Sequence, residues 1–314
     1  MLKIYESIGN FQCVEIIATI TPIRKIEKLE GWLGAHIRNL LLAATSEVVC
    51  ESGGTLMDEI NHFPIEDAAH PWYKELKCGF PKGYTIKVLS PNQSSYRLDI
   101  GCDESIEFSV TLIGSLSKYA SKMIRAIEIF AERGILSPME LEINAVNQYS
   151  MLELLYELRE CDLIAIDFVT PLLLAKSKSV TPNSIQSKMN GFVSMYQLVM
   201  VAANRLFKMA ALYGDFKVST EDISEAIEEL TSIASGITLQ SCNLSRVVLS
   251  TLKKRATKNA MVFDGLIGET QWRGDIAQLY PLLKFCSYIS LGENVVYGMG
   301  DFKVQKVDHI PHSF

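Results

Sequence analysis

Three groups of residues in this sequence could act on a phosphate or move a proton. Glycine occupies positions 292, 298 and 300 of the stretch SYISLGENVVYGMGDFKV, residues 287–304. Basic residues crowd residues 246–273. The chain also has five histidines, and histidine transfers protons near neutral pH because its pKa is about 6.5. They are His36, His62, His70, His309 and His312.

The glycines at 298 and 300 lie one residue apart where alternating apolar residues predict the last core strand, in which their φ angles would be negative. Glycine inside a strand loses packing and backbone entropy, so a ligand or another backbone usually approaches closely there. The spacing is not G-x-G-x-x-G and the surroundings are strand-like, which disfavours a dinucleotide site. A bulge or sharp twist of the sheet is the structural alternative.

The basic segment is the clearest positive patch in a chain whose net charge is −6. Its cations outnumber the nearby acidic residues Asp264 and Glu269. Lysine and arginine bind phosphate with release of counterions, whereas a solvated hairpin tip is the alternative. The cations are Arg246, Lys253, Lys254, Arg255, Lys258 and Arg273.

Length and composition narrow the class of protein. A chain of 314 residues predicts two domains with cores of ordinary size. The longest apolar stretches are interrupted by polar residues such as Asp167 and Gln197, which predicts no membrane span. Seven cysteines without a C-x-x-C pair indicate a reducing cytoplasm and no structural zinc site. We therefore expect neither a metal nor a cofactor.

The elements expected in the first half alternate between strand and helix. Strands are predicted at 11–20, 106–114 and 139–146, with a hairpin over 84–100. Helices are predicted within 27–45 and over 116–130, the second stopped by Gly134. This order is close to the ferredoxin-like, or split βαβ, pattern.

The second half repeats the pattern less regularly. Strands are predicted at 163–174, 246–254 and 261–273, and helices at 191–212, 219–234 and 276–285, with Asp275 capping the last. The stretch 287–304 would form a final hairpin. We therefore expect an α+β protein of two tandem ferredoxin-like domains, residues 1–150 and 151–314.

Several of these stretches resemble, in order, the CRISPR precursor-RNA-processing endoribonucleases of the RAMP superfamily. VTPLLL at 169–174 is similar to the strand that opens that family's second domain. Residues 253–283 resemble its basic strand, G-x-x-G-E strand and leucine-rich helix, and 287–304 resembles its glycine-rich loop. GAHIR at 34–38 and the H-P step at 70–71 are similar to its first helix and the approach to its hairpin.

The resemblance implies an RNA-binding groove between the two domains. It implies that the glycine-rich loop (Gly292, Gly298 and Gly300) lets the RNA backbone approach, and that the basic segment faces an RNA stem. Arg38 projects beside the opening left by Gly34 on the first helix and is expected to join this surface.

The resemblance also implies cleavage without metal, in which the RNA 2′-hydroxyl attacks the phosphate. A general base and a general acid move two protons, and a cation stabilises the crowded phosphate. The products would carry a 2′,3′-cyclic phosphate and a 5′-hydroxyl. His36 on the first helix is the first acid–base candidate and His62 the second. His70 is expected to be structural, and His309 and His312 lie in the terminal tail.

Two other functions stay open at this point. The chain could be a non-catalytic RAMP subunit that binds guide crRNA in a CRISPR effector complex. It could also be a generic RNA-binding tandem domain, although it has no RNP1-type aromatic motif. The expected partners are CRISPR repeat RNA and CRISPR effector subunits, a homodimer is left open, and the expected location is the cytoplasm.

Overall fold

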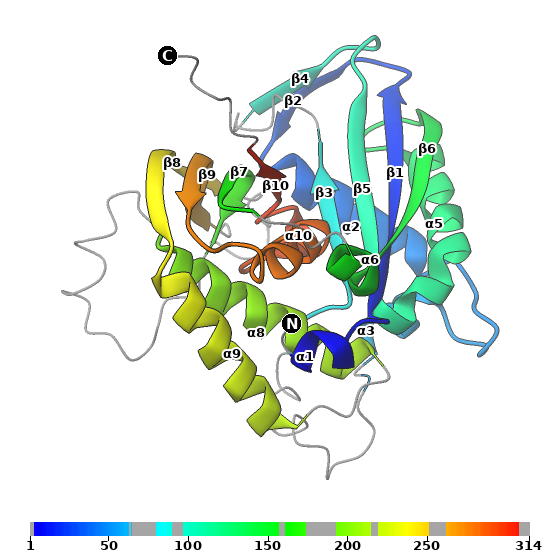
Figure 1. Ribbon diagram of the computed structural model, residues 1–314. Helices are drawn as coiled ribbons and strands as arrows, with labels where there is room; N and C mark the ends of the chain where they lie inside the picture. Colours follow the sequence, from blue (N-terminus) through cyan, green and yellow to red (C-terminus); the bar gives the residue numbers. More distant parts are fainter. Residues whose placement is uncertain are drawn as a thin grey trace.

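The computed structural model describes residues 3–62, 64, 80–89, 97–156, 161–173, 193–214, 219–250 and 262–307. Two four-stranded sheets lie side by side, with a helix between them (Figure 1). Within the described residues, no helix is long and apolar enough to cross a membrane.

The first sheet has the order β3-β5-β1-β6, and neighbouring strands are antiparallel. Its strands are β1 (Gln12–Pro22), β3 (Tyr84–Val88), β5 (Ile106–Ile113) and β6 (Met139–Ser150). Each of the two helices that follow β1 and β5 returns to this sheet, which is the ferredoxin-like arrangement.

Helices α2 (Leu33–Thr45) and α5 (Ala120–Arg133) pack on one face of this sheet (Figure 1). Both bury one apolar stripe, as the helical spacing of these residues predicts. Gly134 ends α5 with a φ of 65°, so the predicted stop is confirmed. The smaller elements are α1 (Lys3–Ser7), α3 (Leu56–Asn61), the 3₁₀ helix η1 (Gly114–Tyr119) and α6 (Met151–Tyr156).

The predicted hairpin over 84–100 is wrong, because its two strands do not pair with each other. β3 pairs with β5, and β4 (Arg97–Ile100) pairs with a short strand, β2 (Ile26–Glu30). Residues 27–30 were expected in the helix, which begins only at Leu33. Strand partners are chosen by tertiary packing, so two neighbouring extended runs can enter different sheets.

The second sheet has the order β10-β7-β9-β8 and repeats the arrangement of the first. Its strands are β7 (Leu163–Leu172), β8 (Thr238–Ser250), β9 (Val262–Arg273) and β10 (Phe302–Lys306). Its helices are α8 (Met195–Tyr213), α9 (Thr220–Ser235) and α10 (Tyr280–Ile289). The predicted α+β fold of two tandem ferredoxin-like units is confirmed.

Capping explains where the second-half helices begin. Ser219 and Asp222 form a capping box at α9, close to the predicted start. Ser194 and Gln197 do the same at α8, so that helix begins later than the predicted range 191–212. Asp275 does not cap α10; that helix begins at Tyr280, with proline in its first turn, where a missing N–H is harmless.

Helix α10 covers the face of the first sheet that α2 and α5 leave free (Figure 1). Ser109 and Thr111 of β5 are buried on that face, and Thr111 donates a hydrogen bond to the Tyr288 carbonyl of α10 at 3.2 Å. Phe11 and Phe285 pack with ring centroids 5.6 Å apart, and one hydrophobic cluster runs through both halves. Whether residues 1–150 and 151–314 are separate folding domains stays a prediction.

Candidate nucleic-acid interface

The glycine-rich loop, residues 291–301, connects α10 to β10 and is not a strand. It contains a short 3₁₀ helix, η2 (Val295–Tyr297), and β10 begins only at Phe302. The φ angles of Gly292, Gly298 and Gly300 are 81°, 82° and 72°. The expectation of negative φ inside a final strand is therefore wrong for Gly298 and Gly300. Apolar residues that are buried in this turn, such as Val295 and Met299, imitate the pattern of a strand.

The chain's own backbone makes the close approach at two of these glycines. A Cβ on Gly300 would overlap the Leu291 carbonyl oxygen, and one on Gly292 would overlap the Leu173 carbonyl oxygen. Gly298 is different, since its nearest neighbour would be the Ile86 carbonyl oxygen at 3.5 Å. Positive φ and crowding by the protein itself thus account for Gly292 and Gly300 without a ligand.

The loop packs on the start of α2. The Trp32 indole N–H donates a hydrogen bond to the Tyr297 carbonyl of the loop. Gly34 makes this possible, because a Cβ there would overlap the same carbonyl oxygen. The Arg38 guanidinium lies one helical turn further on, 4.3 Å from the centroid of the Tyr297 ring. The GAHIR stretch and the glycine-rich loop, far apart in sequence, therefore meet.

A second cation, Lys82, belongs to the same place and was not predicted from the sequence. It lies just before β3, and its Nζ is 4.4 Å from the Phe80 ring centroid. Burial lowers the pKa of the Lys82 amine, and the positive charge of Arg38 lowers it further. The sequence signal for Lys82 is its position at the end of residues 46–82, where glycine and proline recur, because functional residues often lie in such stretches.

Tyr84 completes a group that we call the Arg38 cluster: Arg38, Lys82, Tyr84 and Tyr297. Tyr84 is buried in β3, and burial raises the pKa of its hydroxyl while Arg38 partly offsets the rise. Within the described part of the chain, the buried Arg38 Nε has no hydrogen-bond partner. Two cations and a free donor beside aromatic rings are suited to hold a phosphate and stabilise negative charge on it.

The two histidine candidates that the structure describes, His36 and His62, lie at different helices. His36 is half-buried on α2, two residues before Arg38, so the two side chains leave the helix roughly 200° apart. His62 is exposed at the end of α3, which packs at the far end of α2 through Thr45 and Met57. That end is about 17 Å along the helix from Gly34. His70, His309 and His312 lie outside the described residues.

The basic segment forms the β8–β9 hairpin, as predicted, although β8 begins at Thr238. Arg246 makes a two-bond ion pair with Asp264 across the hairpin, with Nε 2.7 Å from Oδ1. Arg273 pairs with Thr238 at the other end of β9, about 37 Å from Val262. The remaining predicted cations, Lys253, Lys254, Arg255 and Lys258, lie outside the described residues.

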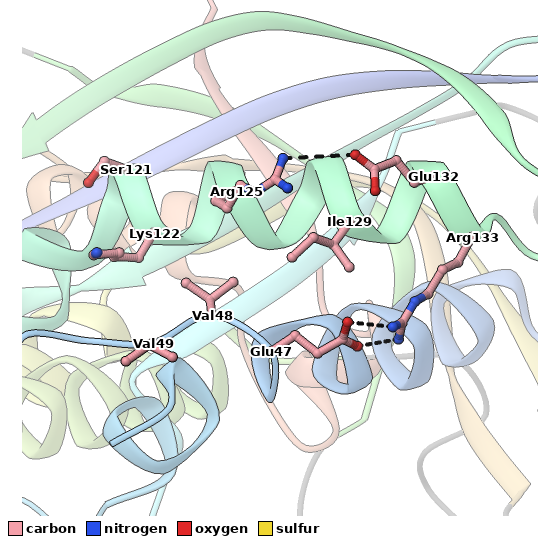
Figure 2. Close-up of a pocket in the computed structure, with 9 residues that line it drawn as sticks. All are labelled: Glu47, Val48, Val49, Ser121, Lys122, Arg125, Ile129, Glu132 and Arg133. Atoms are coloured by element: carbon pink, nitrogen blue, oxygen red, sulfur yellow. Dashed lines mark hydrogen bonds and ion pairs between the residues drawn. The ribbon is translucent and has the colours of Figure 1, made fainter. Parts of the chain in front are cut away.

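A surface depression of about 630 Å³ lies between α5 and the end of α2 (Figure 2). Its charged lining is largely self-paired: Arg133 bonds Glu47, and Arg125 lies 3.8 Å from Glu132. These pairs leave little net charge to attract a ligand. Among the described residues, no group of three or more histidine, cysteine or acidic side chains could hold a metal ion.

Fold and site together define the class: a tandem ferredoxin-like protein with a glycine-rich loop at the junction of its halves. Residues 166–302 match the family model for the CRISPR-associated endoribonuclease Cas6. The chain has the RAMP fold of Cas6-type CRISPR endoribonucleases, and the resemblance stated from its sequence is confirmed. No curated protein sequence matches it.

Solved structures similar to this chain include Cas6 proteins and a larger assembly that contains Cas6. The product complex of Cas6 (TTHB231) from Thermus thermophilus has a TM-score of 0.55 and 16% identity, covering 94% of this chain and 100% of that one. The product complex of Cas6 (TTHA0078) has a TM-score of 0.52 and 12% identity, covering 94% and 100%. A partial Cas6-RT-Cas1–Cas2 complex has a TM-score of 0.52 and 9% identity, covering 96% and 48%.

Proposed function

We propose that this protein is a metal-independent endoribonuclease that cleaves CRISPR repeat RNA to generate guide crRNAs. The observation that carries the proposal is the packing of the glycine-rich loop on α2, which gathers the Arg38 cluster at the junction of the two halves. The family match of residues 166–302 and the likeness to Cas6 product complexes support the same class of reaction.

The proposed chemistry needs only side chains and the RNA. The 2′-oxygen bonds to the adjacent phosphorus as a general base takes its proton, and the bond from phosphorus to the next 5′-oxygen breaks as an acid protonates that oxygen. Arg38 and Lys82 stabilise the negative charge on the phosphate. His36 is the proposed acid or base and His62 the alternative. The products are a 2′,3′-cyclic phosphate and a 5′-hydroxyl.

The proposed RNA surface extends from the Arg38 cluster to the glycine-rich loop and the β8–β9 hairpin. It comprises Arg38, Arg246, Lys253, Lys254, Arg255, Lys258, Arg273, Gly292, Gly298 and Gly300. Among these cations Arg246 contributes least, because Asp264 already neutralises it. Of the three loop glycines, Gly298 has the most open surroundings and is the best supported point of approach for RNA. CRISPR effector subunits and a second copy of the chain are further proposed partners, in the cytoplasm.

One observation favours the alternative, a crRNA-binding subunit without catalysis: His36 and Arg38 leave α2 in opposite directions. Incubation of the purified protein with labelled CRISPR repeat RNA in EDTA distinguishes the two functions. A single cut whose downstream fragment accepts phosphate from a kinase without prior phosphatase treatment supports the nuclease. Binding without cleavage supports the subunit, and neither binding nor cleavage contradicts both.

A further inference from the structure

A buried lysine of the first sheet holds the last residue of the glycine-rich loop. Lys87 of β3 is 6% exposed, and its Nζ lies 3.2 Å from Asp301 Oδ1 and 3.7 Å from Glu15 Oε1. The same Nζ donates a hydrogen bond to the Ser287 carbonyl of α10 at 2.7 Å. Lys87 thus contacts its own sheet, the end of α10 and the end of the loop that follows α10.

Asp301 is fixed from the other side by the second sheet. Its backbone N–H donates to Thr170 Oγ1 at 2.8 Å, and its carbonyl oxygen accepts from the Val169 and Thr170 N–H groups. Its carboxylate reaches across to Lys87 of the first sheet. Asp301 therefore connects the loop to both sheets: its backbone bonds the second sheet, and its carboxylate pairs with Lys87 of the first.

The end of α10 is tied to the first sheet in the same way. The last carbonyls of a helix have no partner within the helix, and here side chains supply the partners. Lys87 binds the Ser287 carbonyl, Thr111 binds that of Tyr288, and Arg205 of α8 binds that of Ile289 at 2.8 Å. The loop thus starts from one anchored point and ends at another, and Lys87 serves both.

We propose that Lys87 is a positioning residue that holds the glycine-rich loop against α2 and thereby orders the Arg38 cluster. The importance of this for RNA rests on the proposed function. The connection is direct: the loop that Asp301 ends also carries Tyr297, whose carbonyl binds Trp32 and whose ring lies under Arg38. If Lys87 is removed, the buried carboxylates of Glu15 and Asp301 lose the cation between them, and their repulsion drives the loop outward.

The experiment measures hydrogen exchange of the peptide covering residues 291–301 in RNA-free protein. Lys87→Met retains the volume of the side chain and removes its charge. We expect exchange in that peptide to rise at least about tenfold, while peptides from β1 and α8 change less than about threefold. Lys87→Arg keeps a cation within reach and should restore protection to within about threefold of wild type.

Two further variants keep the test decisive. Asp301→Asn removes the charge on the loop alone and should raise exchange in residues 291–301 at least about fivefold, even if Lys87→Met does not fold. Glu15→Gln is the matched control, since Glu15 bonds Ser109 and Tyr149 within its own sheet. It should leave loop exchange within about threefold of wild type.

Unchanged loop exchange in Lys87→Met or Asp301→Asn would overturn the proposal, and so would a uniform rise across all peptides. RNA affinity of the same variants is measured separately and should fall at least about tenfold where the loop opens. Because exchange is followed without RNA, a wild-type protein that fails to bind RNA would contradict the proposed function and leave the positioning role to be judged on its own data.

Discussion

Gly300 and Gly298 both have positive φ, but their surroundings differ, so a side chain would have a different effect at each position. A side chain on Gly300 would overlap the Leu291 carbonyl, whereas Gly298 has room for one. Positive φ costs an ordinary residue about 1–2 kcal/mol, and backbone overlap adds to that. The loop glycines are therefore needed first for the fold, and only Gly298 leaves space for a ligand.

We predict that Gly300→Ala destabilises the protein by more than about 3 kcal/mol, whereas Gly298→Ala costs only about 1–2 kcal/mol. Urea unfolding of both variants measures the difference. RNA affinity per folded molecule should fall in Gly298→Ala, because its methyl group lies where the loop is open. Equal destabilisation by the two substitutions would show that crowding at Leu291 does not matter.

His36 and Arg38 leave α2 in opposite directions, so we expect substitutions at the two positions to affect cleavage rate and RNA affinity differently. His36→Ala should slow cleavage by on the order of a hundredfold while RNA binding stays near normal. Arg38→Met should weaken RNA binding as well, because it removes the cation over Tyr297. Single-turnover rates and affinities of the two variants make the comparison. If His36→Ala lowers the rate less than about threefold, the acid–base role lies elsewhere, with His62 tested next.

Among the elements proposed to bind RNA, the β8–β9 hairpin has part of its positive charge neutralised by its own acidic residue. Arg246 is bonded twice to Asp264, so it offers a phosphate little free charge. The four cations between the strands are not matched by acidic residues in the same stretch of sequence. Lys253, Lys254, Arg255 and Lys258, rather than Arg246, should therefore carry the salt dependence of RNA binding.

We predict that reversing the charge of Lys253, Lys254 and Arg255 flattens the log–log dependence of RNA affinity on salt. Each lost phosphate contact should lower the slope by roughly 0.7–0.9. Arg246→Ala serves as the control and should change the slope by less than about 0.3, since Asp264 already neutralises that arginine. An unchanged slope in the triple variant would show that these three cations do not contact RNA phosphate.

Across the whole molecule, burial raises the pKa of several cysteine and tyrosine side chains. These groups keep their protons at a pH at which the unfolded chain has lost them. Burial raises the pKa of the Cys286 thiol from 9.0 to about 12, and it raises the pKa values of Cys13, Tyr5 and Tyr213 in the same direction. Burial alone would lower the pKa of Lys87, but the carboxylates beside it raise that pKa above its usual value.

The sign of the pH effect follows from these directions. Above about pH 9 the folded protein binds more protons than the unfolded chain, so the free energy of unfolding falls as pH rises. Each such group contributes about 1.4 kcal/mol per pH unit beyond its unfolded pKa. We predict that the melting temperature drops by about 5 °C or more between about pH 8 and pH 10.5. Calorimetry across that range measures it, and a constant melting temperature would contradict these buried-group assignments.

Local pattern was enough to find most elements and the family to which they point. The apolar stripes of α2, α5, α8 and α9, the start of α9 near residue 219 and the Gly134 stop depend on neighbours within a few residues, and the ordered motifs of the second half are linear in the chain. Arg38 was identified in the same way, from its place beside Gly34 on the first helix.

Long-range packing decided the rest, because strand partners and buried faces depend on residues far away in the chain. The pairing of β3 with β5 and of β4 with β2 exists only in the folded chain, as does the burial of Thr111 under α10. The loop glycines likewise need positive φ because backbone from other parts of the chain packs against them. Lys82 and Lys87 have no motif in sequence. Lys82 becomes a candidate for function only beside Arg38, and Lys87 only where Asp301 of the second half meets the first sheet.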